Sequence, residues 1–188
     1  PGKIAEIKKL LSDLPIKIVP QSKFDIPPVE ETGTTFVENA IIKARHAAKH
    51  SGLPAIADDS GLTVDALGGA PGVRSARYAG ENASDEERIV KLLAELQKTG
   101  KDDRDACYHC VIALMGTDLE PAPLLCHGIW EGEILKEPRG DKGFGYDPVF
   151  YIPTHDCSVA ELAEEEKNAI SHRGQAMEQL IEVLEEIA

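Results

Sequence analysis

The sequence lacks both an excess of positive charge and any long apolar stretch. Its 188 residues include 20 Lys and Arg against 33 Asp and Glu, which gives a formal net charge of −13. Because such a chain repels a phosphate backbone, we expect no binding to long nucleic acid. No apolar run approaches the roughly 18 residues that a membrane span requires, and neither a signal peptide nor a basic transit segment opens the sequence. We therefore expect a cytoplasmic protein that has no membrane partner.

Motifs of two common phosphate and acyl chemistries are also missing. The sequence contains neither the G-x-x-x-x-G-K-[ST] loop of P-loop enzymes nor the G-x-S-x-G elbow of serine hydrolases. Its adjacent pair Asp58-Asp59 is not the D-x-D arrangement of phosphoaspartate phosphatases either. These absences favour metal-assisted attack by water over a covalent intermediate.

Cysteine is scarce, and its placement argues against a zinc or redox site. Cys107 and Cys110 form a C-x-x-C motif, a pattern that can bind zinc or carry a redox disulfide. They lie in an apolar run that predicts a strand, on which side chains three positions apart point to opposite faces. We therefore expect these two residues, together with Cys126 and Cys157, to be buried free thiols.

The residues that are present predict one α/β domain over residues 1–188, a length that fits a single domain. Capping boxes that start at Thr35, Ser84 and Ser158 predict three helix starts, with helices over residues 36–50 and 85–98. A final amphipathic helix follows Ser171. Apolar runs predict strands over residues 16–19, 53–57, 106–115, 123–135 and 149–152. Early alternation of helices and strands, with a hairpin later, predicts a mixed sheet with flanking helices.

A carboxylate pair forms the strongest local signal. The predicted strand over residues 53–57 is followed directly by Asp58 and Asp59, and ligands of open α/β sheets bind beyond the carboxyl ends of strands. An Asx-turn is the structural alternative. Because successive strand residues face opposite ways, we expect the two aspartates to have different roles, one in the ligand site and one shaping the neighbouring loop. Glu30 is a candidate second oxygen donor for Mg2+, although the pair Glu30-Glu31 alone would be read as exposed loop charge.

Two later segments carry further signals. Gly143 and Gly145 flank Phe144 in a loop, where the ring could stack on a base or could cover the core. The tripeptide Ser171-His172-Arg173 stands at a predicted helix start, where its donors could bind a carbonyl or a phosphate, or could be ordinary polar residues of a helix end.

Taken in order, these segments resemble the inosine/xanthosine triphosphate pyrophosphatase family over essentially the whole chain. The segments that carry the resemblance are Glu30-Glu31-Thr32-Gly33, Thr35-Phe36-Val37-Glu38-Asn39-Ala40, Ala57-Asp58-Asp59-Ser60-Gly61-Leu62, Leu67-Gly68-Gly69-Ala70-Pro71-Gly72, Ser75-Ala76-Arg77-Tyr78, Gly143-Phe144-Gly145-Tyr146-Asp147-Pro148, and Glu166-Lys167 through Ser171-His172-Arg173.

The resemblance implies an elongated two-lobed fold, a homodimer, and a nucleotide cleft between the lobes. It also implies Mg2+-dependent hydrolysis of ITP, dITP and XTP to the monophosphate and pyrophosphate, which cleanses the nucleotide pool. Asp59 matches the catalytic aspartate and a metal ligand, and Glu30 matches the other metal carboxylate. Implied substrate contacts, with Phe144 stacking on the base, are Pro1, Gly2, Lys3, Ser60, Phe144, Gly145, Tyr146, Asp147, Lys167, His172 and Arg173.

At its start the sequence departs from the family pattern. Lys3 matches the lysine that ends the family's Thr/Ser-Gly-Asn-x-x-Lys phosphate motif, but the beginning of that motif and the strand before it are absent from this sequence.

Two other functions remain to be weighed against this one. A Maf-like pyrophosphatase would cut pyrimidine or modified nucleotides with the same metal chemistry, but Phe144 and Ser171-His172-Arg173 argue against it. A nucleotide sensor that does not hydrolyse its ligand would not need both Glu30 and Asp59.

Overall fold

The computed structural model describes residues 8, 11–12 and 15–187. The predictions for Pro1, Gly2 and Lys3 lie outside the described residues. Within the described part of the chain, no helix has the length and apolar character to cross a membrane. The helices are α2 (Phe36–Ser51), α3 (Asp85–Thr99), α4 (Glu164–Ile170) and α5 (His172–Ile187), and the strands are β1 (Ala55–Val64), β2 (Asp105–Met115), β3 (Leu124–Ile134), β4 (Phe150–Ile152) and β5 (Cys157–Ser158).

The described strands form one sheet in the order β1-β2-β3-β4-β5, which confirms the α/β class. β4 pairs antiparallel with β3 and with β5, in registers that place Glu133 opposite Tyr151 and Ile152 opposite Cys157. The chain divides into two compact units. The first comprises Pro1–Asp59, Cys110–Gly128 and Arg173–Ala188, and the second comprises Ser60–His109 and Ile129–His172.

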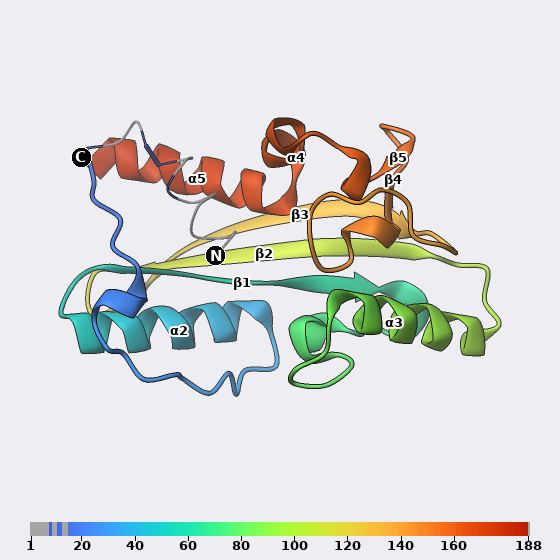
Figure 1. The fold of residues 1–188 in the computed structure, drawn as a ribbon. Coiled ribbons are helices and arrows are strands. Elements are labelled where there is room, and N and C mark those ends of the chain that lie inside the picture. The colour runs from blue at the N-terminus through green and yellow to red at the C-terminus, as the bar shows by residue number, and fades with distance from the viewer. Residues whose placement is uncertain (1–7, 9–10, 13–14, 188) are drawn as a thin grey trace. The chain divides into compact units, whose positions relative to one another are not determined.

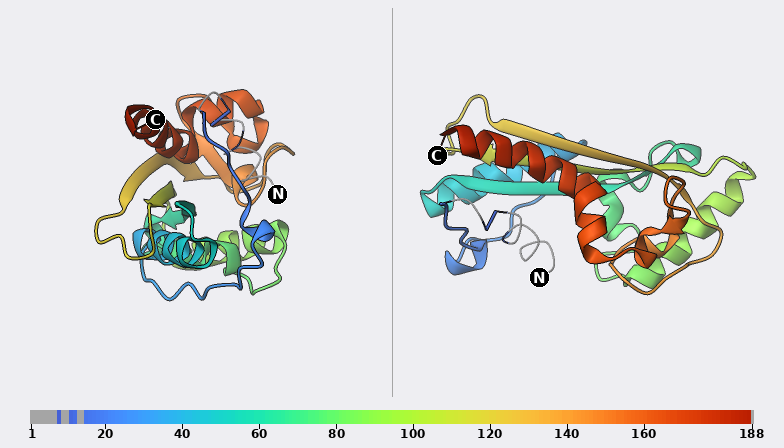
Figure 2. Two further views of the ribbon diagram at one scale, coloured as in Figure 1. Left: turned by 90° about the vertical axis from the view of Figure 1, so that its left-hand side faces the viewer. Right: turned by 90° about the horizontal axis from the view of Figure 1, so that it is seen from above.

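In the first unit, α2 and α5 lie on opposite faces of the strands (Figure 1), and the end-on view agrees (Figure 2). The alternation of β2 produces this arrangement, because Cys110 and Ile112 share a core with Met177 and Leu180 of α5. Val111, Ala113 and Met115 share the other core with the small residues Ala40, Ala44 and Ala48 of α2.

Both ends of α2 follow the sequence prediction. Thr35 and Glu38 form the capping box, and Gly52 ends the helix with a left-handed φ of 66°. Midway along the helix, the Arg45 guanidinium donates to the backbone carbonyls of Asp118 and Glu120. This contact ties α2 to the turn between β2 and β3.

The second unit has a core of its own. Leu62 and Val64 of β1 share it with Ile89, Leu92 and Leu96 of α3, and α3 begins at the predicted capping box of Ser84 and Glu87.

The structure contradicts the sequence predictions for residues 16–19 and for the helix expected at Ser158. Residues 16–19 form no strand, and Pro15 and Pro20 on either side supply no N–H with which a ladder could extend beyond this four-residue segment. The capping box of Ser158 and Glu161 does form, but it starts only a 3-10 turn, Val159–Glu161. That turn ends because Leu162 is extended and buried in the core of the second unit, so α4 begins later, at Glu164.

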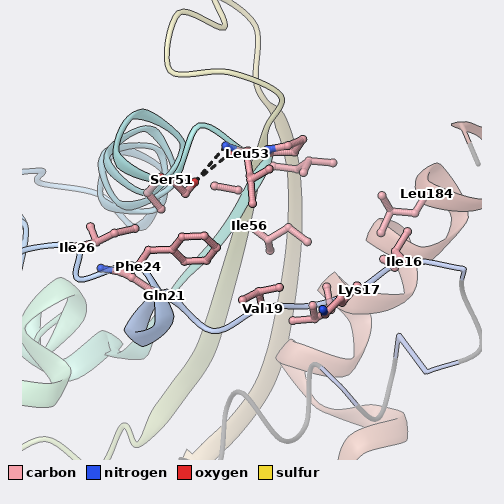
Figure 3. Close-up of a pocket in the computed structure, with 15 residues that line it drawn as sticks. Ile16, Lys17, Val19, Gln21, Phe24, Ile26, Ser51, Leu53, Ile56 and Leu184 are labelled. Carbon is pink, nitrogen blue, oxygen red and sulfur yellow. Dashed lines mark hydrogen bonds between the residues drawn. The ribbon is translucent and has the colours of Figure 1, made fainter.

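In place of the predicted strand, residues 16–19 line an apolar pocket of the first unit (Figure 3). The pocket has a volume of about 390 Å³, and Phe24, Leu53, Ile56 and Leu184 also line it. None of the predicted site residues is among its lining residues.

None of the four cysteines, all of which the structure describes, forms a disulfide. Cys110 and Cys126 are buried, whereas Cys107 and Cys157 are only partly buried.

Candidate active site

Asp58 and Asp59 lie in the middle of β1, so the prediction that the strand ends before them is wrong. β1 continues to Val64 because Leu62 and Val64 are fully buried in the core of the second unit. A strand held by buried side chains beyond the two aspartates keeps both of them in fixed, extended backbone.

Asp59 forms an ion pair with α2. The Lys43 Nζ donates to Asp59 Oδ1 at 2.7 Å and lies 3.2 Å from Glu31 Oε1. Asp59 is only 7% exposed, and its other oxygen, Oδ2, is buried with no hydrogen-bond partner within the described residues. One oxygen of this carboxylate is therefore anchored, and the other retains its acceptor capacity.

Burial raises the pKa of the Asp59 carboxyl above its ordinary value, and the hydrogen bond and charge of Lys43 offset only part of this effect. The Asn39 amide also acts to lower this pKa, although no hydrogen bond of normal geometry joins the two side chains. At Lys43, burial acts to lower the pKa, but the hydrogen bond and charge of Asp59 outweigh it, so the pKa is raised. Lys43 is thus a permanent cation at neutral pH.

Asp58 faces the other way. Its Oδ2 lies 3.8 Å from an Nη atom of Arg173, at the start of α5. The contacts of the two aspartates with α5 and α2 confirm that they point to opposite faces of the strand. Asp58 thus forms a long ion pair with a helix, and its role in shaping the neighbouring loop stays a prediction.

The loop before α2 presents one acidic residue to Lys43 and another to solvent. Glu31 is partly buried and pairs with Lys43, whereas Glu30 is exposed. Within the described residues, no group of three or more His, Cys, Asp or Glu side chains is placed to hold a metal ion. Mg2+, however, commonly takes only one or two protein carboxylates, with phosphate oxygens and waters completing its shell. The buried Asp59 Oδ2 fits that donor type.

The second unit gathers another set of predicted site residues around Asp147. This carboxylate is 3% exposed. Its Oδ2 accepts from the Phe144 backbone N–H at 3.0 Å and from Lys167 Nζ at 2.7 Å. The Lys167 ammonium also lies 4.5 Å from the centroid of the Phe144 ring, and that ring is 45% exposed. The ammonium therefore lies over one face of an aromatic ring that remains partly exposed.

Two neighbouring residues fasten the same loop. The Tyr146 hydroxyl donates to the Ser75 carbonyl at 2.8 Å, and the Gly145 N–H donates to Asp85 Oδ2 at 2.7 Å. Tyr146 is buried, and its hydroxyl anchors the loop. Phe144, by contrast, has an exposed ring.

His172 belongs to the second unit and is buried. Its ring stacks on Tyr108, with centroids 4.7 Å apart and planes at 11°. Ser60, another predicted substrate contact, is partly buried in β1.

Sequence reasoning did not single out Tyr108 or the pairing of Lys43 with Asp59. Tyr108 sits in the apolar run of β2, where nothing distinguishes a site residue from core. A signal for Lys43 did exist, because its spacing of four from Asn39 places both on one face of α2.

Comparison with known proteins covers nearly the whole chain. Residues 1–183 match the Ham1 family. The chain is 65% identical over 185 residues to a dITP/XTP pyrophosphatase of Coxiella burnetii, covering 98% of this chain and 92% of that protein. It is 55% identical to a dITP/XTP pyrophosphatase of Vibrio cholerae, with the same coverage.

Solved structures agree with the sequence matches. A HAM1 protein of Coxiella burnetii superposes with a TM-score of 0.96 at 64% identity, covering 98% of this chain and 94% of that one. The Ham1 protein of Staphylococcus aureus gives a TM-score of 0.90 at 46% identity, covering 100% and 95%.

Proposed function

The chain belongs to the Ham1 family, and from that premise we propose that it hydrolyses deaminated purine nucleoside triphosphates, ITP, dITP and XTP, to the monophosphate and pyrophosphate. The observation that carries this proposal is the agreement, over 98% of the chain, with a protein described as a dITP/XTP pyrophosphatase. The family match also favours this function over the Maf-like and sensor alternatives.

In this proposal, Asp59 and Glu30 hold Mg2+. The ion, when bound, would neutralise phosphate charge and lower the barrier to attack by water. Asp59 positions or deprotonates the attacking water. Lys43 holds Asp59 through its bond to Oδ1, which leaves Oδ2 available to a ligand.

The proposed base contacts come from the loop around Phe144 and from the start of α5. Phe144 stacks on the base, and its exposed ring beside Lys167 supports that role. His172 and Arg173 donate to the 6-oxo group that hypoxanthine and xanthine share. Adenine carries an amino group at that position and would leave these donors unpaired, at a cost of roughly 1–3 kcal/mol each.

Other substrate contacts follow from the family pattern, among them Gly145, Tyr146 and Asp147 beside Phe144. Pro1, Gly2, Lys3 and Ser60 are proposed to bind the rest of the nucleotide, with Lys3 adding positive charge near the phosphates. A homodimer in the cytoplasm completes the proposal, and light scattering coupled to gel filtration tests the dimer.

The decisive experiment measures the products formed from ITP with and without Mg2+. We expect IMP and pyrophosphate in equal amounts, no turnover in EDTA, and recovery when Mg2+ is restored. Release of orthophosphate would contradict the proposed bond cleavage. Faster turnover of CTP or UTP would point to the Maf-like alternative, and ITP binding without turnover would point to a sensor.

A further inference from the structure

Among the described residues, three groups donate to the Asp147 carboxylate, two of them to Oδ2 and one to Oδ1. Phe144 N–H and Lys167 Nζ both donate to Oδ2. The Tyr108 hydroxyl donates to Oδ1 at 3.2 Å. Tyr108 therefore opposes rotation of the carboxylate that would carry Oδ2 away from the other two donors.

That rotation matters because Oδ2 links the Phe144 loop to Lys167 of α4, two groups that the proposed function places against the base. Through its bond to Lys167, Asp147 fixes the ammonium 4.5 Å from the centroid of the Phe144 ring. Through its bond to the Phe144 N–H, Asp147 also fixes the backbone from which that ring projects. A carboxylate free to turn would leave both groups less well placed.

The ring of Tyr108 also packs against two aromatic residues. Its ring stacks on His172 at a centroid distance of 4.7 Å and contacts Phe150 at 4.4 Å. Tyr108 is 7% exposed. Burial and the charge of Asp147 raise the pKa of its hydroxyl well above the ordinary value, so the group remains a proton donor at neutral pH.

We propose that Tyr108 is a positioning residue for base binding, whose hydroxyl orients Asp147 and thereby the Phe144 ring and the Lys167 ammonium. The inference rests on the proposed function, since it concerns the same substrate. It adds a residue from the interior of β2 that contacts two segments carrying proposed base contacts, the Phe144 loop and the start of α5.

The test is Tyr108→Phe, which removes the hydroxyl and keeps the ring that stacks on His172. Tyr151→Phe is the matched control, because the Tyr151 hydroxyl also donates to an aspartate, Asp156, at 2.8 Å, but on the surface of the same unit. We expect Tyr108→Phe to raise the KM for ITP about tenfold, as the loss of a hydrogen bond to a carboxylate predicts, with kcat within about twofold. The control should leave both constants unchanged.

Inhibition constants separate positioning from general destabilisation. IMP carries the base, whereas pyrophosphate does not. The Ki of IMP should therefore rise by the same factor as the KM, and the Ki of pyrophosphate should stay constant.

A lower kcat with unchanged KM and Ki values, in proportion to the folded fraction measured by circular dichroism, would overturn the inference. So would a Tyr108→Phe variant that is indistinguishable from wild type. Failure of the wild-type protein to release pyrophosphate from ITP would instead defeat the proposed function itself.

Discussion

Gly143 occupies a position where a methyl group would strike Asp147. Its φ is +75°, and a Cβ built on it would lie 2.1 Å from Asp147 Oδ2. Gly145, two residues later, has a φ of +64°, and a Cβ built on it would meet no atom within 4 Å. Gly143→Ala and Gly145→Ala therefore impose similar backbone strain, but only the first also displaces a carboxylate.

The size of the difference follows from what that oxygen binds. Alanine in the left-handed region costs about 1–2 kcal/mol in either variant. Displacing Asp147 Oδ2 weakens two charge-assisted hydrogen bonds, from Phe144 and Lys167, each contributing about 1.5–3 kcal/mol. Allowing for partial relaxation of the loop, we expect Gly143→Ala to lose about 2–4 kcal/mol more than Gly145→Ala.

Urea denaturation of the two variants and wild type measures this difference, and ITP kinetics measure its effect on the site. Gly143→Ala should also raise the KM for ITP, because the Phe144 ring and the Lys167 ammonium lose their common anchor. Equal stability losses in the two variants, with equal KM values, would refute the reasoning.

Three further predictions concern single side chains. Asp59→Asn should fold as wild type, by circular dichroism, but lose about 10²-fold or more in kcat for ITP; Asp58→Asn should lose less, and equal losses would show a shared role. Arg173→Ala should lower the ITP-to-ATP ratio of kcat/KM, mainly by weakening ITP, and should change the ITP-to-GTP ratio less; an equal fall for ITP and ATP would make Arg173 a phosphate-binding or structural residue. Arg45→Ala should lower the free energy of unfolding by about 1–2 kcal/mol, because it removes the donors to two carbonyls of the β2–β3 turn. ITP turnover at 25 °C should stay intact, and unchanged stability would contradict the anchoring role.

Helix starts were predictable because their determinants are local. Thr35 and Glu38 are three residues apart, as are Ser84 and Glu87, and each pair closes its box within one turn. Ser158 and Glu161 satisfy the same rule. Whether a helix continues beyond that turn depends on Leu162, which is buried by residues distant in sequence. Local sequence therefore could not predict it.

Strand limits and side-chain partners were less predictable, since both depend on residues distant in sequence. The alternation rule correctly predicted that Asp58 and Asp59 face opposite sides of the strand, but it could not show that β1 continues past them into a second core. Tyr108 reads as a core residue in sequence, and only the fold brings its hydroxyl to Asp147, 39 positions away.

The placement of two carboxylates on consecutive residues of β1 has a consequence for how this gene can vary. Inserting or deleting one residue just before Asp58 would exchange the faces of the strand, turning Asp59 toward α5 and Asp58 toward the lysine of α2. Changes of length in this segment should therefore be rejected by selection even when every residue type is kept. In the polar turn between β2 and β3, an added residue exchanges no faces, so insertions that leave the carbonyls of Asp118 and Glu120 within reach of Arg45 should be accepted.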